Sequence, residues 1–469
     1  MSHSAKADDV KLSKLFPADV KKNVAENERS GRTALVREKK DAPNLEAGQS
    51  MGNAMKSKFA TLVASPALIL TALLITPPAS ANGFGITDLV TDDNTNLASL
   101  GLPTAAHVDA NLVNPWGISF SPTSPFWISD NGMGVSTLYN ATGVPQSLVV
   151  TVAPGLPGGF VSAPTGTVFN NNSADFMVPT GAQTTGSANF LFDTENGVIS
   201  GRSGSIGGGT QSFVGVDNSA SGAVYKGLAI APGAGGHNVI FASNFNSGMV
   251  EEYNSTWGLV KTFTDPSLPP VPAGTPAGQN WAPFNVQVLN GQLYVTYALQ
   301  DAAHHDDVAG AGYGFVDVFD TNGNFIKRVV DVGAGDPLDS PWGLAIAPAG
   351  FGTFANDLLV GNFGDGEIDA FNLTTDSFVG VVTDPNGNPI EIPGLWALVV
   401  RNGVNGFNPN AVYFTAGLPL ASDLEDLEQA GVFGLLVAVP EPSTIALLLA
   451  GLAGMFWYRR KRVAPVQYR

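Results

Sequence analysis

The 469-residue chain contains no cysteine, and only 13% of its residues are charged. The lack of cysteine excludes disulfide bonds, thiolate catalysis and cysteine-ligated zinc, so the fold must be stabilised by packing without covalent cross-links. Positive charge is also scarce, because residues 82–439 contain 6 Lys and Arg against 31 Asp and Glu. A body this acidic is repelled by nucleic-acid phosphates and anionic lipids, which argues against both as partners and leaves cations and neutral glycans open.

Glycine and proline are abundant, with 55 and 32 residues, and they indicate short strands and many turns. A short opener recurs about every fifty to sixty residues and is followed by an apolar strand. The six openers are Pro115-Trp116-Gly117, Pro164-Thr165-Gly166, Tyr225-Lys226-Gly227, Pro283-Phe284-Asn285, Pro341-Trp342-Gly343 and Gly394-Leu395-Trp396. Four antiparallel strands per unit, repeated six times, predict an all-β fold, a six-bladed β-propeller over residues 82–439.

The two ends of this region predict how the ring closes. The last unit shows only three strands, the third of them at residues 432–437, while the segment 86–91 precedes the first opener without a partner of its own. Placed beside each other, these segments complete the sixth blade and remove the open edges that favour aggregation. The N-terminal strand is therefore expected to be essential for stability.

The segments before the propeller are expected to lie outside the fold. Residues 1–54 are rich in Lys, Glu and Asp and predict a disordered extension or a start assigned too far upstream. Residues 55–81 have the form of a signal peptide, with Lys56 and Lys58, an apolar run and small residues before a cleavage point after Ala81. The alternative is a membrane anchor, for which the apolar run is short.

Residues 440–469 have a tripartite pattern: Pro440, Glu441 and Pro442, an apolar segment that predicts a short transmembrane helix, and a basic end. The basic residues are Arg459, Arg460, Lys461 and Arg462, which orient such a helix with this end in the cytoplasm. This tail resembles the PEP-CTERM sorting signal of Gram-negative bacteria. The resemblance implies transient anchoring in the inner membrane, processing by an exosortase, and release to the cell envelope or exterior. The alternative is a permanent single-pass anchor.

The repeated units resemble NHL-type and gluconolactonase-like six-bladed propellers, although they lack the charged signatures of individual NHL repeats. The whole arrangement is similar to a family of uncharacterised propeller proteins that carry PEP-CTERM signals. The resemblance implies a fold and a cellular address, and a shared fold does not by itself assign a function.

Candidate binding residues recur where the second strand of a unit ends, on the side of the ring that carries the long loops. They are Asp130, Asn131, Asn244, Asn362 and the nearby Asp365, and oxygen ligands of this kind suit calcium or sugar hydroxyls. The structural alternative is that they cap turns. Trp116 and Trp342 are expected near the same face, where an indole can stack on a sugar or pack between blades.

A second candidate is the loop that contains His304, His305, Asp306 and Asp307, because imidazole and carboxylate groups suit zinc or another divalent ion. Adjacent histidines do not have the spacing that usually converges on one metal, so a solvated polar loop is the alternative. The sequence offers no catalytic triad, nucleophile elbow or phosphate-binding loop to nominate.

Three functions follow from these observations. The first is a non-catalytic binding or scaffold module of the bacterial envelope or exopolysaccharide matrix, with a polysaccharide or an envelope protein as partner. The second is a metal-dependent propeller hydrolase of the lactonase kind, which requires a metal over the channel near Asp130, Asn244 and Asn362. The third is a structural envelope protein that assembles with copies of itself. The sequence leaves the oligomeric state open.

Overall fold

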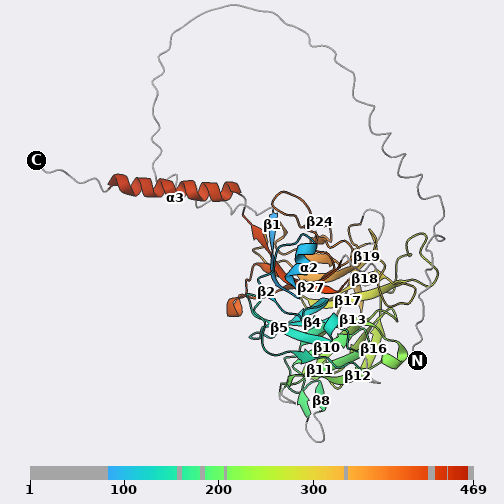
Figure 1. The fold of residues 1–469 in the computed structure, drawn as a ribbon. Helices are drawn as coiled ribbons and strands as arrows, with labels where there is room; N and C mark the ends of the chain where they lie inside the picture. Colours follow the sequence, from blue (N-terminus) through green and yellow to red (C-terminus); the bar gives the residue numbers. More distant parts are fainter. Residues whose placement is uncertain are drawn as a thin grey trace, which may run out of the picture. The chain divides into compact units, whose positions relative to one another are not determined.

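The computed structural model describes residues 83–155, 161–179, 185–204, 209–331, 336–420, 428–440 and 442–462. The predicted extension and signal peptide, residue Glu441 of the sorting motif and the end of the tail after residue 462 lie outside these ranges. Figure 1 shows the strands of the described part gathered into several small sheets. Six of these sheets have at least four strands and form the blades of a propeller.

Blades one to three are antiparallel sheets whose strands follow one another outward from the ring centre. Blade one consists of β3 (Pro115–Ser119), β4 (Phe126–Asp130), β5 (Val135–Tyr139) and β6 (Val150–Thr151). Blade two consists of β7 (Pro164–Phe169), β10 (Phe190–Thr194), β11 (Val198–Arg202) and β12 (Phe213–Asp217), with a hairpin of β8 (Met177–Pro179) and β9 (Thr185–Ser187) inserted after its first strand. Blade three consists of β13 (Tyr225–Pro232), β14 (Asn238–Asn244), β15 (Met249–Tyr253) and β16 (Leu259–Phe263).

The remaining blades complete the ring. Blade four consists of β17 (Trp281–Leu289), β18 (Gln292–Leu299), β19 (Gly314–Phe319) and β20 (Phe325–Val330). Blade five consists of β21 (Pro341–Ile346), β22 (Leu358–Asn362), β23 (Ile368–Phe371) and β24 (Phe378–Val381). Blade six consists of β25 (Leu395–Val400), β26 (Ala411–Leu418), β27 (Ala430–Val439) and β1 (Gly83–Thr91), to which β2 (His107–Val108) adds in parallel. A short helix, α2 (Asn94–Ser99), follows β1.

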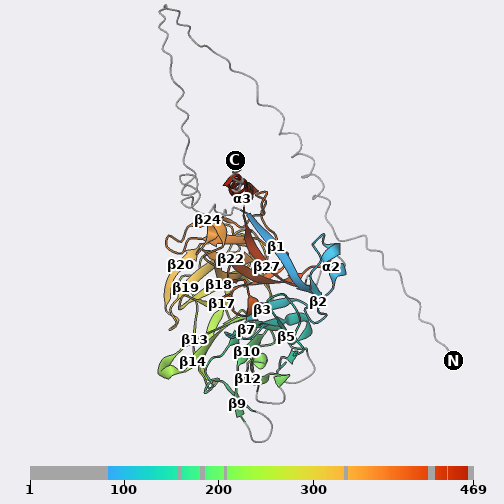
Figure 2. The same ribbon diagram turned by 90° about the vertical axis from the view of Figure 1, so that its left-hand side faces the viewer.

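The predicted closure of the ring is confirmed. Strand β1 pairs antiparallel with β27, so that Ile86 lies opposite Leu436 and Thr91 opposite Val432. Figures 1 and 2 both show the blue β1 beside the red β27. The sixth blade therefore combines strands from the two ends of the propeller, and every blade has its full set of strands.

The first strand of each blade, which we call its inner strand, lies closest to the ring centre. The contacts between these strands explain why the openers contain glycine. Each first strand contacts the first strand of the next blade, and β25 contacts β3, which closes the circle. A Cβ atom added at Gly166 would lie 2.3 Å from the backbone nitrogen of Leu228, and one at Gly343 would lie 2.6 Å from the carbonyl oxygen of Trp396. Only glycine permits this approach of neighbouring backbones.

The C-terminal tail forms a single helix, α3 (Pro442–Arg462). Proline suits the first turn of a helix because its missing N–H would have no intrahelical partner there. Within the described ranges, no helix is both long and apolar enough to cross a membrane.

Candidate functional site: the charged mouth of the central channel

In each blade, the first strand begins on the same side of the ring as the second strand ends. Pro115 pairs with Asp130, Tyr225 with Asn244, and Pro341 with Asn362. We call this side the loop face, because the connections 131–134, 195–197, 245–248, 300–313 and 363–367 all leave the second strands there. The loop face therefore collects side chains from all parts of the chain around the ring axis.

Tryptophan side chains form the floor of the site on the ring axis. Trp116 and Trp396 stack with 3.4 Å between ring centroids, and Trp342 meets both rings edge-on at 6.0 and 5.9 Å. All three are buried. The Trp116 and Trp342 side chains thus pack against other blades, which is the structural alternative for these residues.

A buried lysine lies directly above this floor. The Nζ atom of Lys226 is 5.2 Å from the centroid of the Trp116 ring and donates to Glu195 Oε1 at 2.5 Å and to Asp306 Oδ1 at 2.9 Å. The Lys226 and Glu195 side chains are 2% and 12% exposed, whereas Asp306 is 62% exposed. His305 Nδ1 lies 3.0 Å from the same Asp306 oxygen. We call Glu195, Lys226, His305 and Asp306 the mouth cluster.

The charges of the mouth cluster stabilise one another. Burial alone would lower the pKa of Lys226, but the carboxylates of Glu195 and Asp306 more than offset burial and raise it. Burial would likewise raise the pKa of Asp306, but the hydrogen bond from His305 and the charge of Lys226 hold it well below its usual range. Bonding to Asp306 raises the pKa of His305. The buried ammonium group of Lys226 is therefore stabilised by the carboxylates that surround it.

Asn114 connects the tryptophan floor to a further carboxyl group. Its Oδ1 atom accepts hydrogen bonds from Nε1 of both Trp116 and Trp396 at 3.0 Å, and its Nδ2 atom donates to Glu428. Burial, followed by the nearby charge of Glu195, raises the pKa of Glu428 to about 8. Asn114 has a φ of 47°, which is uncommon for a residue other than glycine. Asn114 thus joins the tryptophan floor to a buried carboxyl group whose pKa is raised.

Two of the predicted candidate residues bond within their own blades. Asn244 Nδ2 donates to Glu251 at 2.8 Å, and Asn362 Nδ2 donates to Asp369 at 2.9 Å, in each case from the second strand to the third. Asp130 occupies the corresponding place in blade one, where burial raises its pKa and Thr137 on the next strand lies beside its carboxylate. These three residues are fully or almost fully buried in separate blades.

The other predicted residues divide between the mouth and its surroundings. Asn131 Nδ2 donates to Glu195 at 2.8 Å, which ties it to the mouth cluster. His305 and Asp306 belong to the cluster, but His304 Nε2 bonds the carbonyl oxygen of Gly278 instead. Burial raises the pKa of Asp307 to about 6. Asp365 is exposed and accepts from the backbone of Glu367.

The sequence patterns do not predict Glu195, Lys226 or Glu428 as site residues. Lys226 had one visible signal, since it stands in an opener where the other blades have tryptophan, threonine, phenylalanine or leucine, and charge is scarce throughout the propeller. Glu195 and Glu428 lie in non-repeated loops, and only the closed ring brings them near Lys226.

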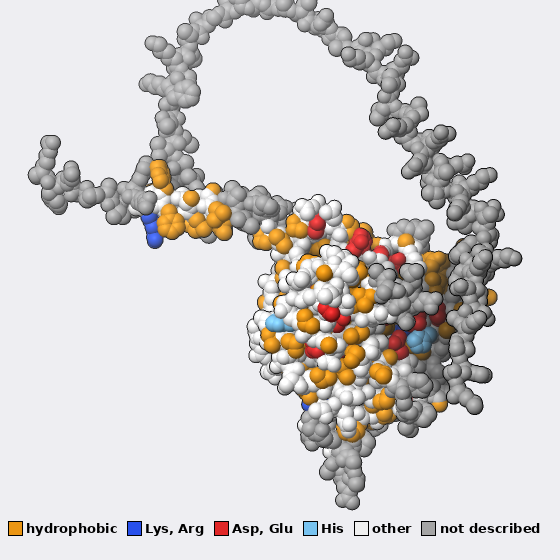
Figure 3. Space-filling view, in the orientation of Figure 1, with side chains coloured by type: hydrophobic (Ala, Val, Ile, Leu, Met, Phe, Trp, Pro, Cys, Tyr) orange, Lys and Arg blue, Asp and Glu red, His pale blue; other side chains and the backbone are white. Residues whose placement is uncertain are grey.

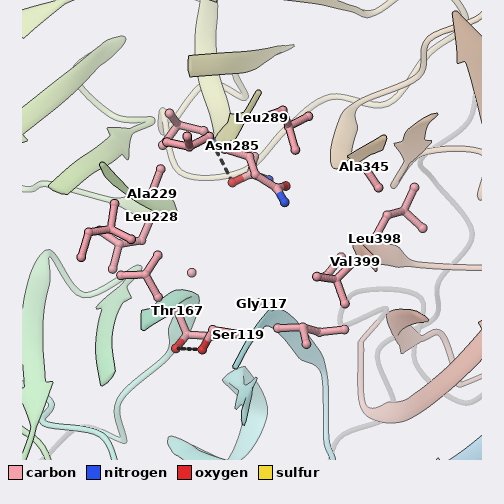
Figure 4. Close-up of a pocket in the computed structure, with 18 of the residues that line it drawn as sticks. Gly117, Ser119, Thr167, Leu228, Ala229, Asn285, Leu289, Ala345, Leu398 and Val399 are labelled. Atoms are coloured by element: carbon pink, nitrogen blue, oxygen red, sulfur yellow. Dashed lines mark hydrogen bonds between the residues drawn. The ribbon is translucent and has the colours of Figure 1, made fainter. Parts of the chain in front are cut away.

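The other end of the channel has a different chemistry. A cavity of about 530 Å³ is lined by inner-strand residues of all six blades, and Trp342 is among them. Figure 4 shows apolar side chains around an open centre, with Ser119 and Thr167 joined by a hydrogen bond of 3.0 Å. None of the lining residues is charged. Carboxylates predominate among the charged side chains on the propeller surface seen in Figure 3.

Three donor side chains at the mouth could hold a metal ion. Glu195, His305 and Asp306 each offer one ligand atom, and these atoms lie within 4.8 Å of one another. Carboxylate and imidazole groups suit zinc and related first-row divalent ions. The arrangement thus has the donor groups of a cation site, although two of them are bonded to Lys226, and it can hold polar groups of a ligand that reaches the exposed His305 and Asp306.

A comparison with protein families decides the nature of the tail. Residues 438–462 match the model of the PEP-CTERM protein-sorting motif. The chain carries a PEP-CTERM sorting tail. This motif implies export, sorting to the cell surface and processing by an exosortase.

The propeller itself is similar to proteins of a giant virus. Uncharacterized protein R648 of Acanthamoeba polyphaga mimivirus is 29% identical over 341 residues, covering 71% of this chain and 79% of the relative. Uncharacterized protein L690 of the same virus is 29% identical over 301 residues, covering 63% of this chain and 75% of the relative.

Among solved structures, the fold resembles luciferin-regenerating enzyme, with 11% identity, a TM-score of 0.43, and coverage of 76% of this chain and 96% of that one. It also resembles streptogramin B lyase, with 9% identity, a TM-score of 0.40, and coverage of 75% and 96%. Similarity this distant carries no inference about chemistry.

Proposed function

We propose that the protein is an exported, non-catalytic binding or scaffold propeller of the bacterial envelope or exopolysaccharide matrix. The observation that carries this proposal is the PEP-CTERM motif at residues 438–462, attached to a propeller whose mouth charges are already paired with one another. Residues 55–81 would serve as the signal peptide, and α3 would hold the chain transiently at the inner membrane until an exosortase cuts near the motif.

The ligand-binding surface in this proposal is the mouth on the loop face. Asp306 and His305 are the exposed members of the mouth cluster. Asp306 is held by its bond to the buried Lys226, and His305 is held by its bond to Asp306. Oxygen and nitrogen atoms fixed in this way can receive sugar hydroxyls or polar groups of a protein without a large loss of side-chain entropy. Neutral glycans fit the acidic body better than anionic polymers do.

The binding proposal is tested with the full exported chain on an array of neutral and acidic glycans, and by capture of envelope proteins from the cells that make it. We expect binding of a neutral glycan or an envelope protein, weakened at least tenfold by Asp306→Asn. Ser99→Ala on α2 is the control, because this exposed hydroxyl lies outside the mouth. Unaltered binding by Asp306→Asn would refute the mouth as the binding surface, and absence of any ligand in both assays would refute the binding function.

The sorting part of the proposal has a separate test. Replacement of Pro440, Glu441 and Pro442 by alanine should retain the chain in the membrane fraction with its tail uncut, whereas the unaltered chain should appear in shortened form outside the inner membrane. Equal processing of both chains would contradict the assignment of the tail to an exosortase.

A metal-dependent hydrolase is a second candidate, and the Glu195, His305 and Asp306 group is the observation that favours it. A self-assembling structural protein is a third, favoured by apolar side chains exposed on outer strands. These are Leu259, Val260, Ile326, Phe378 and Val379. Sedimentation that does not change with protein concentration would contradict self-assembly.

A further inference from the structure

Lys226 has an unusual position for a cation in this chain. Its side chain is 2% exposed and lies on the ring axis, above the Trp116 ring and between carboxylates from blade two and from the loop 300–313 of blade four. An ammonium group is costly to bury unless it is paired and hydrogen-bonded. Glu195 and Asp306 provide this compensation, so the three side chains form one unit.

The same carboxylates belong to a group with the composition of a metal site. Atoms that share a zinc ion at about 2.1 Å lie no more than about 4.2 Å apart, and the ligand atoms of Glu195, His305 and Asp306 are within 4.8 Å of one another. Rotation of the half-exposed His305 and Asp306 side chains would bring the ligand atoms to the shorter separation that a zinc ion requires. The exposure of these two residues would also leave room for water in the remaining coordination positions.

A metal ion and the lysine compete for the same oxygen atoms. Nζ of Lys226 is bonded to Glu195 Oε1 and Asp306 Oδ1, and an ion placed between these oxygens would lie against the ammonium group. Two positive charges so close together repel, and because the Lys226 side chain is only 2% exposed, little water reaches its ammonium group to screen this repulsion. Lys226 cannot easily move away, because Trp116 and Phe245 pack against its end on the channel side.

We propose that the ammonium group of Lys226 occupies the position of a divalent metal ion, so that Lys226 is the residue that keeps this mouth free of metal. Replacement of Lys226 by a neutral side chain then opens a site for a first-row transition ion at Glu195, His305 and Asp306. This inference concerns the mouth to which the binding proposal assigns the ligand. Its test does not use that ligand, so the two can fail independently.

The test compares zinc chloride binding to the full exported chain and to its Lys226→Gln variant by calorimetry. The unaltered chain is expected to bind no stoichiometric zinc, whereas Lys226→Gln should bind one ion at least a hundredfold more tightly and show a higher Tm with zinc than without it. In the Lys226→Gln background, His305→Ala should weaken binding at least tenfold. His304→Ala is the matched control and should leave binding unchanged, because His304 bonds Gly278 outside the cluster.

A second measurement does not require a Lys226 variant to fold. The ammonium signal of Lys226 should be visible by nuclear magnetic resonance in the unaltered chain, because its hydrogens are buried and bonded, and it should not change on addition of zinc chloride. Loss of this signal on zinc addition, or one-to-one zinc binding by the unaltered chain that His305→Ala abolishes, would overturn the proposal. A folded Lys226→Gln protein that binds no zinc would overturn it as well.

Discussion

The two ends of the central channel are built on the same six inner strands, yet one end is charged and the other is not. The mouth on the loop face contains Glu195, Lys226, His305 and Asp306, whereas the cavity beyond the tryptophan floor is lined by uncharged residues only. The cavity walls come from the repeated strands, and the mouth residues other than Lys226 come from loops. Repetition thus specifies the ring, and departures from repetition specify its chemistry.

The largest loss of stability is expected from substitutions where the first strands of neighbouring blades touch, in the wall that both ends of the channel share. A side chain at Gly166 would meet the backbone of Leu228, so Gly166→Val should lower the free energy of unfolding by at least about 4 kcal/mol or prevent folding. Gly222→Ala is the control, because nothing lies within 4 Å of its added Cβ and only its positive φ of 76° costs energy, about 1 kcal/mol. Urea unfolding distinguishes the two, and equal losses would contradict the close packing of the ring.

The next largest losses of stability compare a residue at the charged end of the channel with one at the uncharged end. Lys226→Met leaves the buried Glu195 carboxylate without its positively charged partner and should cost about 3–5 kcal/mol, whereas Leu228→Ala in the cavity wall should cost about 2–3 kcal/mol through lost packing. The loss for Lys226→Met should also shrink at low pH, where the carboxylates become protonated, and that for Leu228→Ala should not. A Lys226→Met protein as stable as the unaltered one would remove the distinction between the two ends.

A smaller effect depends on pH and concerns Glu428. Its folded-state pKa of about 8 lies above the usual 4.5, so the folded chain holds this proton more tightly than the unfolded chain does. The resulting stabilisation is complete below about pH 4.5 and is lost as the pH rises through 8. Glu428→Gln should therefore reduce the fall in stability between pH 5 and pH 8 by on the order of 3 kcal/mol. Identical pH profiles of the two proteins would contradict burial of this carboxyl group.

The smallest effect is expected at the uncharged end. Ser119 and Thr167 are bonded to each other in the cavity wall, and Ser119→Ala should cost about 1 kcal/mol, since one hydroxyl loses its partner. Its effect should not depend on salt concentration or pH, in contrast to Lys226→Met. A marked salt dependence would indicate that charge reaches this end of the channel.

The sequence predicts the ring well because each blade repeats the same physical requirement. The opener glycines permit close backbone contact, and the unpaired segment 86–91 finds its partner in β27. The candidate site is predicted less completely. His305 and Asp306 are in the cluster, but the Asn244 and Asn362 side chains bond within their blades, since the same polar residues serve the strand ends. Glu195 and Glu428 could not be found, because no local pattern tells which loops meet above the axis.

The central claim is that the ammonium group of Lys226 neutralises the mouth without a metal ion, and the effect of a chelator on thermal unfolding tests it most directly. We predict that the Tm of the exported chain at pH 7 is the same, within about 1 °C, with excess EDTA and with excess zinc chloride, since ligands that bind only the folded state raise Tm. A Tm that falls by several degrees in EDTA, and recovers when zinc is restored, would contradict the account.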